Sequence, residues 1–168
     1  MCVCYSVVSL QRPTGSYTVA GAPRYNHIGR AVFLGRDPQT QQWAVRQTID
    51  GEQIGSYFGA ELCSVDLEGD GWTDLLLVGA PLYHETDIGG LVSVCQISPQ
   101  GNASCPSALR GQAGQTLGRF GSAISALGDL NGDGLTDVAV GAPLEDGHRG
   151  SVYIYHGTEG GIAPSYSQ

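Results

Sequence analysis

A sequence unit recurs in this chain of 168 residues, and the recurrence restricts the possible folds more than any other feature. In both copies a Phe-Gly pair precedes a loop of nine residues rich in Asp and Gly, and a Gly-Ala-Pro triplet follows it. Phe58 and Phe120 of the pairs are 62 positions apart, as are Gly79 and Gly141 of the triplets. Such a period predicts equivalent units that stack on their neighbours. A further triplet at Gly21 has no acidic loop before it, so we expect one partial and two complete repeats.

Each acidic loop places oxygen-bearing side chains at positions one, three, five and nine, with glycine at position six. Calcium takes about six to eight oxygen ligands, which a tight loop can supply from alternate residues and from a backbone carbonyl at position seven. The sequence therefore predicts two calcium sites. Their ligands are Asp66, Glu68, Asp70, Trp72 and Asp74 in the first loop, and Asp129, Asn131, Asp133, Leu135 and Asp137 in the second, with Trp72 and Leu135 donating carbonyls.

Two other interpretations of these loops were weighed. An EF-hand requires glutamate at position twelve, but those positions hold Leu77 and Val140 within apolar runs, so the EF-hand is excluded. Two solvated hairpin turns would also be rich in Asp, Asn and Gly. Because the same pattern occurs twice in register with its flanks, calcium binding is the favoured interpretation. Glu68 is one methylene longer than the usual residue at position three, so the first loop departs further from the pattern.

The segments around these motifs predict an all-β fold. Short apolar runs are separated by many of the 26 glycines, and residues 74–78 are apolar enough to form a strand buried on both faces. The small residues of the triplets are expected to end such a strand where a neighbour packs closely. Four short antiparallel strands per repeat are typical of a β-propeller blade.

This pattern predicts a partial β-propeller with four segments. They are a non-propeller leader over 1–15, a partial blade without a calcium loop over 16–49, and calcium-bearing blades over 50–110 and 111–168.

The charge of the chain indicates which partners to expect. Sixteen acidic and eight basic residues give a net charge of -8, which disfavours nucleic acid and anionic lipid and favours a cation. No apolar run reaches the ~20 residues that a membrane helix needs. Residues 1–10 are apolar but lack a basic start and a cleavage site. We therefore expect no signal peptide, no transmembrane segment and no direct membrane contact in this chain.

The cysteines suggest one disulfide bond. Cys95 and Cys105 flank a polar stretch that a disulfide would close as a hairpin loop. Asn102 in that stretch begins an Asn-Ala-Ser acceptor for N-glycosylation, which is meaningful if the chain is secreted. The pairing of the remaining cysteines, Cys2, Cys4 and Cys63, is left open.

The order of Phe-Gly, acidic loop and Gly-Ala-Pro resembles the FG-GAP repeat of integrin alpha chains, and the wording of 53–59 and 150–157 is also similar to that family. The resemblance implies part of a seven-bladed propeller in the head of a cell-surface adhesion receptor. That receptor acts as a heterodimer with a beta subunit and binds an extracellular protein ligand as a full-length molecule. The Cys95 and Cys105 hairpin, with Cys63, is most similar to the subgroup with an inserted ligand-binding domain, which includes the leukocyte members.

The resemblance also implies that the face opposite the calcium loops, around 81–87 and 143–148, meets the beta subunit. An enzyme is disfavoured because the chain has no Gly-x-Ser-x-Gly, Walker or His-Glu-x-x-His motif. Two alternatives stay open: an independently secreted calcium-binding module, and the accessory propeller of a phospholipase-like enzyme.

Overall fold

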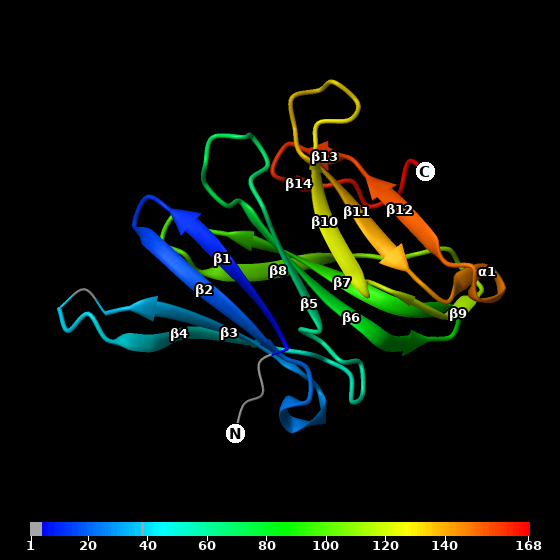
Figure 1. Cartoon of the computed structure of the whole chain (residues 1–168), viewed down its shortest axis with the longest axis horizontal. Helices are drawn as coiled ribbons and strands as arrows, with labels where there is room; N and C mark the ends of the chain where they lie inside the picture. Colours follow the sequence, from blue (N-terminus) through cyan, green and yellow to red (C-terminus); the bar gives the residue numbers. More distant parts are fainter. Residues whose placement is uncertain (1–4, 38) are drawn as a thin grey trace.

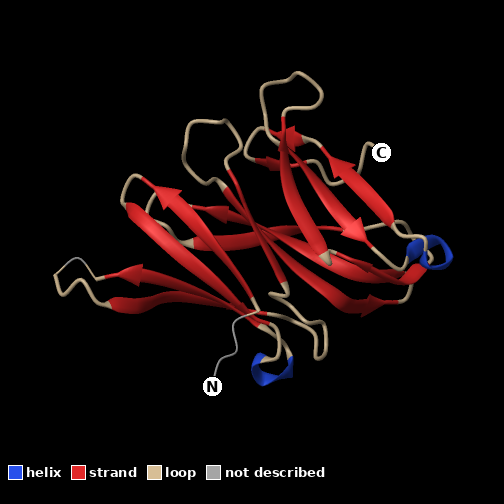
Figure 2. Ribbon diagram, viewed as in Figure 1, coloured by secondary structure: helices blue, strands red, loops and turns tan. Residues whose placement is uncertain are grey.

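Antiparallel strands build almost all of this protein, as Figure 2 shows for the computed structural model. The structure describes residues 5–37 and 39–168. In chain order the elements are β1 (Ser6–Arg12), β2 (Gly15–Ala22), η1 (Tyr25–His27), β3 (Arg30–Arg36), β4 (Trp43–Asp50), β5 (Glu61–Val65), β6 (Leu75–Glu85), β7 (Ile88–Ile97), β8 (Ala103–Leu109), β9 (Gln115–Phe120), β10 (Ala123–Gly128), β11 (Asp137–Ala142), α1 (Glu145–His148), β12 (Ser151–Tyr155), β13 (Gly157–Thr158) and β14 (Gly161–Ile162). Within these described residues, no helix has the length and apolar character to cross a bilayer.

The strands form three main sheets that fan out side by side (Figure 1). Their strand orders are β1-β2-β3-β4, β5-β6-β7-β8 and β10-β11-β12, and neighbours within each sheet are antiparallel. β9 lies outside this order and pairs in parallel with β7. A small hairpin of β13 and β14 follows the third sheet. The predicted all-β, partial-propeller architecture is confirmed, and the described sheets form an open fan.

The first sheet contains a strand that the sequence analysis assigned to the leader over 1–15. β1 pairs with β2 from Ser6 opposite Gly21 to Arg12 opposite Gly15. Leu10 alone is fully buried in this strand, so the segment carries too little apolar periodicity to indicate a strand by itself. The boundary at residue 16 is therefore corrected, because the first sheet runs over 6–50. Residues 1–4 lie outside the described part of the chain.

The third sheet contains three of the four strands expected for its blade. Beyond β12, the last two residues lie along the outer edge of the sheet. The Ile154 N–H donates to the Gln168 carbonyl (3.0 Å), and the Ser167 N–H donates to the Ile154 carbonyl (2.8 Å). Within the described residues, the segment 167–168 therefore lies where a fourth strand would pair with β12.

β6 is the central strand of the molecule and is buried on both faces. Leu75 and Leu77 belong to the core between the second and third sheets, whereas Leu76 and Val78 belong to the core between the first and second. All four side chains are at most 1% exposed. Fully burying such a side chain contributes about 2 kcal/mol. Because alternate residues of β6 enter different cores, this strand stabilises the packing of the second sheet against both neighbouring sheets. The predicted strand with two apolar faces is confirmed.

The Phe-Gly pairs and the Gly-Ala-Pro triplets meet where adjacent sheets touch. The Gly59 N–H donates to the Gly79 carbonyl of its own repeat (3.0 Å), and the Gly121 N–H donates likewise to Gly141 (3.0 Å). The carbonyls of the same two residues press against the preceding repeat. A Cβ placed on Gly21 would lie 1.9 Å from the Gly59 oxygen, and one on Gly79 would lie 2.3 Å from the Gly121 oxygen. Close approach of two backbones therefore requires these glycines, as the triplets predicted.

The triplet does not end β6, although the sequence analysis expected it to do so. β2 and β11 end within their triplets, but β6 continues beyond Pro81 to Glu85. Its pairing with β7 shifts register after Ala80 and resumes at His84 opposite Gly89. The second repeat therefore carries a longer hairpin, whose extension is held by β7 rather than by the buried core.

Candidate metal-binding loops

The two acidic loops leave the same edge of the sheets and lie next to each other at the top of Figure 1. Loop one (66–74) joins β5 to β6, and loop two (129–137) joins β10 to β11. Their common placement follows from the repeat, because each loop connects the first and second strands of its own sheet. The ten predicted ligand residues are thus divided between two equivalent corners.

Loop one is folded around its own aspartates. The carboxylate at position one accepts three backbone N–H groups, and the carboxylate at position nine accepts the N–H of position two. These bonds run to Asp66 from Gly69 (2.8 Å), Asp70 (3.1 Å) and Gly71 (2.7 Å), and to Asp74 from Leu67 (2.8 Å). The Trp72 N–H donates to Asp70 (2.8 Å), which fixes position seven relative to position five.

Loop two repeats this pattern bond for bond. The bonds run to Asp129 from Gly132 (2.7 Å), Asp133 (3.2 Å) and Gly134 (2.8 Å), to Asp137 from Leu130 (2.9 Å), and to Asp133 from Leu135 (2.9 Å). Gly71 and Gly134 at position six have φ of 90° and 87°, in the left-handed region that favours glycine. The shared sequence therefore encodes one loop conformation twice.

The environment of loop two keeps Asp129 and Asp137 ionised. The N–H groups, that of Gly134 first, hold the pKa of Asp129 below its usual range. Burial alone would raise the pKa of Asp137, which is 0% exposed, but N–H groups of Gly157 and Leu130 and the His156 ring 3.2 Å away outweigh burial and lower it. Both carboxylates therefore carry negative charge at neutral pH, as cation ligands must.

The donor set fits a hard cation by its chemistry. The predicted side-chain ligands are all oxygen donors, and Glu68, Asp70, Asn131 and Asp133 are exposed. Within the described residues, no group of three or more His, Cys, Asp or Glu side chains is placed to hold a metal ion. The aspartates at positions one and nine accept backbone N–H groups. The backbone of each loop is thus held by its own carboxylates, and the side chains at positions three and five are accessible to solvent.

The loops are joined to the repeats before them through position eight. The Thr73 N–H donates to the Gln11 carbonyl (2.8 Å), and the Thr136 N–H donates to the Leu67 carbonyl (2.9 Å). The second of these bonds links loop two directly to loop one. Each loop is therefore supported by its neighbour as well as by its own carboxylates.

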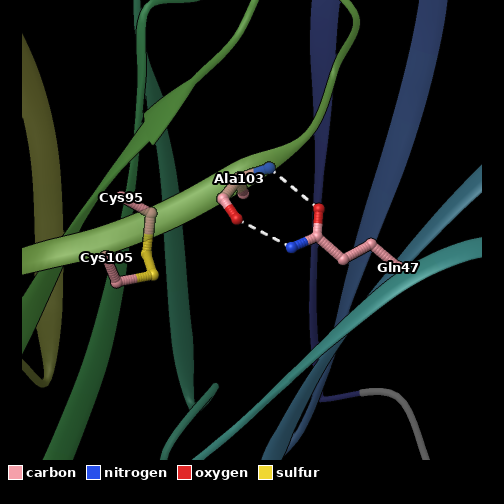
Figure 3. The surroundings of a disulfide bond; sticks show 4 residues. All are labelled: Gln47, Cys95, Ala103 and Cys105. Atoms are coloured by element: carbon pink, nitrogen blue, oxygen red, sulfur yellow. Dashed lines mark hydrogen bonds between the residues drawn. A yellow bond between two sulfur atoms is a disulfide. The ribbon is translucent and has the colours of Figure 1, made fainter.

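Cys95 and Cys105 form a disulfide bond between β7 and β8, as predicted (Figure 3). Beside it, the Gln47 side chain on β4 exchanges two hydrogen bonds with the backbone of Ala103, at 2.7 and 2.8 Å. These bonds attach the first sheet to the hairpin that the disulfide closes. Asn102, the predicted glycosylation residue, is exposed in the turn of that hairpin.

Cys63 is a free cysteine on β5, and burial raises the pKa of its thiol. Cys2 and Cys4, whose pairing the sequence left open, lie outside the described residues.

Two basic residues next to the loops were missed by the sequence analysis. Arg12 on β1 lies 3.6 Å from Asp74, and His156 lies 3.2 Å from Asp137. Arg12 and Asp74 are far apart in the sequence, so no local pattern indicates that they are close in space. The periodicity could have indicated this proximity only if residues before 16 had been assigned to the first blade.

Comparisons with known proteins agree with the architecture. The FG-GAP repeat family matches residues 58–95 and 120–155. Integrin alpha-D from Homo sapiens is 53% identical over 153 residues, which cover 89% of this chain and 13% of the relative. Integrin alpha-X from Homo sapiens is 52% identical over the same shares, and integrin alpha-E from Mus musculus is 48% identical over 171 residues, 98% of this chain and 15% of the relative. The chain thus spans a small part of the length of these relatives.

The chain therefore contains two matched FG-GAP repeats, and its sheets and interlocking glycines have a partial-propeller arrangement. Its repeats are similar to those of the integrin alpha chains, as the resemblance of the motifs indicated.

Proposed function

We propose that this chain is the calcium-binding propeller segment of an integrin-like alpha subunit, a non-enzymatic part of a cell-surface adhesion receptor. The receptor acts as a heterodimer with a beta subunit and binds its extracellular protein ligand as a full-length molecule. The observation that carries the proposal is the duplicated loop, which repeats the same carboxylate-to-backbone bonds in both matched repeats.

In this function, side chains of Asp66, Glu68, Asp70 and Asp74 would hold one calcium ion and those of Asp129, Asn131, Asp133 and Asp137 the other, with the carbonyls of Trp72 and Leu135 completing each set. Calcium would supply positive charge that offsets the repulsion between neighbouring carboxylates. The aspartates at positions one and nine accept backbone N–H groups that order the loop, and the exposed residues at positions three and five would supply further oxygen ligands. The role of the metal is structural, since metal binding and loop order are coupled.

The edge opposite the loops would meet the beta subunit. Ile54 and Leu82 on that edge are 77% and 45% exposed, and their segments are joined by a hydrogen bond from the Leu82 N–H to the Ser56 carbonyl (3.0 Å). An ordered edge with exposed apolar side chains is suited to a protein partner. N-glycosylation at Asn102 would occur on the loop side of the disulfide hairpin, away from this edge.

Calcium binding is tested by isothermal titration of the whole chain and of Asp133→Ala. We expect two bound calcium ions in the wild type and one in the variant, because Asp133 supplies both a ligand oxygen and the brace to Leu135. Asp37→Ala is the matched control, since Asp37 also accepts backbone N–H groups in a turn, from Gln39 and Thr40, but belongs to no acidic loop. Absence of binding heat in the wild type, or equal loss in both variants, contradicts the proposal.

The heterodimer is tested by coexpression with integrin beta chains and affinity capture. We expect capture to fall when Ile54 and Leu82 are both changed to Asp, with calcium binding unaffected. Failure of every beta chain to capture the wild type would favour the independently secreted module instead.

A further inference from the structure

β1 fixes an arginine beside loop one. The Gln11 N–H donates to Thr73 Oγ1 (3.0 Å), and the Thr73 N–H donates to the Gln11 carbonyl (2.8 Å). Arg12, the next residue, donates from Nη1 to the Thr73 carbonyl (2.7 Å). Its side chain is only 9% exposed. Two hydrogen bonds of the Gln11 backbone and one of the guanidinium, all to Thr73, therefore hold Arg12 beside the loop.

The charge of Arg12 faces the carboxylate at position nine. Nη1 lies 3.6 Å from Asp74 Oδ1, which is too far for a hydrogen bond. The Arg12 Nε is buried and has no hydrogen-bond partner within the described residues. The guanidinium therefore acts on loop one through its charge, rather than as one half of a tight bidentate pair.

Loop two has the same backbone junction with a different neighbour. The Thr136 N–H donates to the Leu67 carbonyl, as the equivalent threonine of loop one donates to Gln11. The residue that follows Gln11 is the basic Arg12, whereas the residue that follows Leu67 is the acidic Glu68. At this junction, loop one therefore has the permanently charged Arg12 beside its position-nine carboxylate, whereas loop two has Glu68 at the equivalent sequence position and, from its own repeat, the His156 ring beside Asp137.

We propose that Arg12 lowers the affinity of loop one for divalent cations, so that loop two fills first and loop one fills only at higher cation concentration. The inference rests on the proposed calcium-binding function and adds an order of filling to it. Nη1 lies 3.6 Å from Asp74 Oδ1, and a bond from calcium to a ligand oxygen measures about 2.4 Å. An ion bound to that oxygen would thus lie within about 6 Å of a unit positive charge, which opposes binding by roughly tenfold even at the dielectric constant of water. Arg12 of the first sheet therefore sets the cation concentration at which loop one of the second sheet is filled.

Trp72 makes loop one visible by itself, because it stands at position seven of loop one where loop two has Leu135. We would titrate the whole chain with terbium and measure both total binding and the terbium emission sensitised by excitation of tryptophan. Trp72→Phe, which keeps the backbone carbonyl, should remove this emission. In the wild type we expect the emission to lag behind the first bound equivalent. Emission that rises with the first equivalent overturns the order of filling.

Arg12→Gln should tighten loop one by about tenfold and leave loop two unchanged, and the difference from wild type should shrink in high salt. Arg12→Lys keeps the charge and should bind like the wild type. Arg149→Gln makes the same charge change at a side chain that is 81% exposed and remote in the fold from loop one, so it should have no effect. Equal tightening by Gln and Lys, or by Arg149→Gln, overturns the role of Arg12. Absence of any bound terbium or calcium in the wild type defeats the proposed function itself.

Discussion

Gly79 in the second repeat and Gly141 in the third hold the same position in their sheets, but only the first is covered. The Gly121 carbonyl lies against Gly79, whereas a Cβ on Gly141 would meet only Ala123, at 3.5 Å or more. The residues opposite these glycines on the neighbouring strand also differ in exposure. Val92, opposite Gly79, is fully buried, whereas Val152, opposite Gly141, is 64% exposed. The repeat sequence fixes the shape of a sheet, and the neighbouring repeat decides how much of it is buried.

The covered glycine should be far less tolerant of substitution than the open one. Gly79→Ala places a methyl group against a backbone oxygen and a side chain, so we expect a loss of about 3 kcal/mol in the free energy of unfolding. Gly141→Ala meets ordinary contact distances and should change stability by less than about 1 kcal/mol. Urea denaturation of the two variants measures both values. Similar losses would show that the glycines are needed within each sheet rather than between sheets.

The two loops offer a second comparison, at the carboxylate of position nine. Asp137 is fully buried and accepts N–H groups from Leu130 and Gly157, while the Asp74 side chain is 34% exposed. Without metal, Asp137→Ala leaves two donors unsatisfied and should cost about 2 kcal/mol, whereas Asp74→Ala should cost about 1 kcal/mol. Thermal unfolding in chelator compares the variants. Equal costs would mean that burial does not distinguish the loops.

The features that could be predicted from sequence are those encoded within one repeat. The apolar run of β6, the spacing of Cys95 and Cys105 and the alternation of loop oxygens each carry a local signal. Properties that depend on stacking carry none in a single segment. β1 shows only Leu10 as a fully buried residue, and the approach of Arg12 to Asp74 joins residues from different repeats. The end of β6 was misplaced because pairing with β7, and not the triplet, decides it.

The third strands of the second and third repeats, β7 and β12, are also stabilised in different ways. Positions occupied by Ser93 and the disulfide-bonded Cys95 on β7 are occupied by Tyr153 and Tyr155 on β12. The rings of Tyr153 and Tyr155 both pack edge-on against Phe120. The second repeat therefore uses a covalent bond where the third uses an aromatic cluster.

We expect the aromatic cluster to make the third repeat sensitive to alkali. The Tyr153 hydroxyl donates to the buried Glu145 and accepts the Gln112 N–H (3.0 Å), and burial, reinforced by Glu145, raises the pKa of Tyr153 to about 12. Because the folded pKa lies above the unfolded value of about 10, the stabilisation is complete below pH 10 and is lost as the pH rises through 12.

Tyr153→Phe should cost about 1 kcal/mol at pH 8 and reduce the loss of stability between pH 10 and 12. Urea denaturation across this range measures the slope, and Tyr83→Phe, at a partly buried tyrosine of the second repeat, should keep the wild-type slope. An unchanged slope in Tyr153→Phe would assign the alkaline sensitivity to other groups, and Tyr155, whose pKa is also raised by burial, is the next to change.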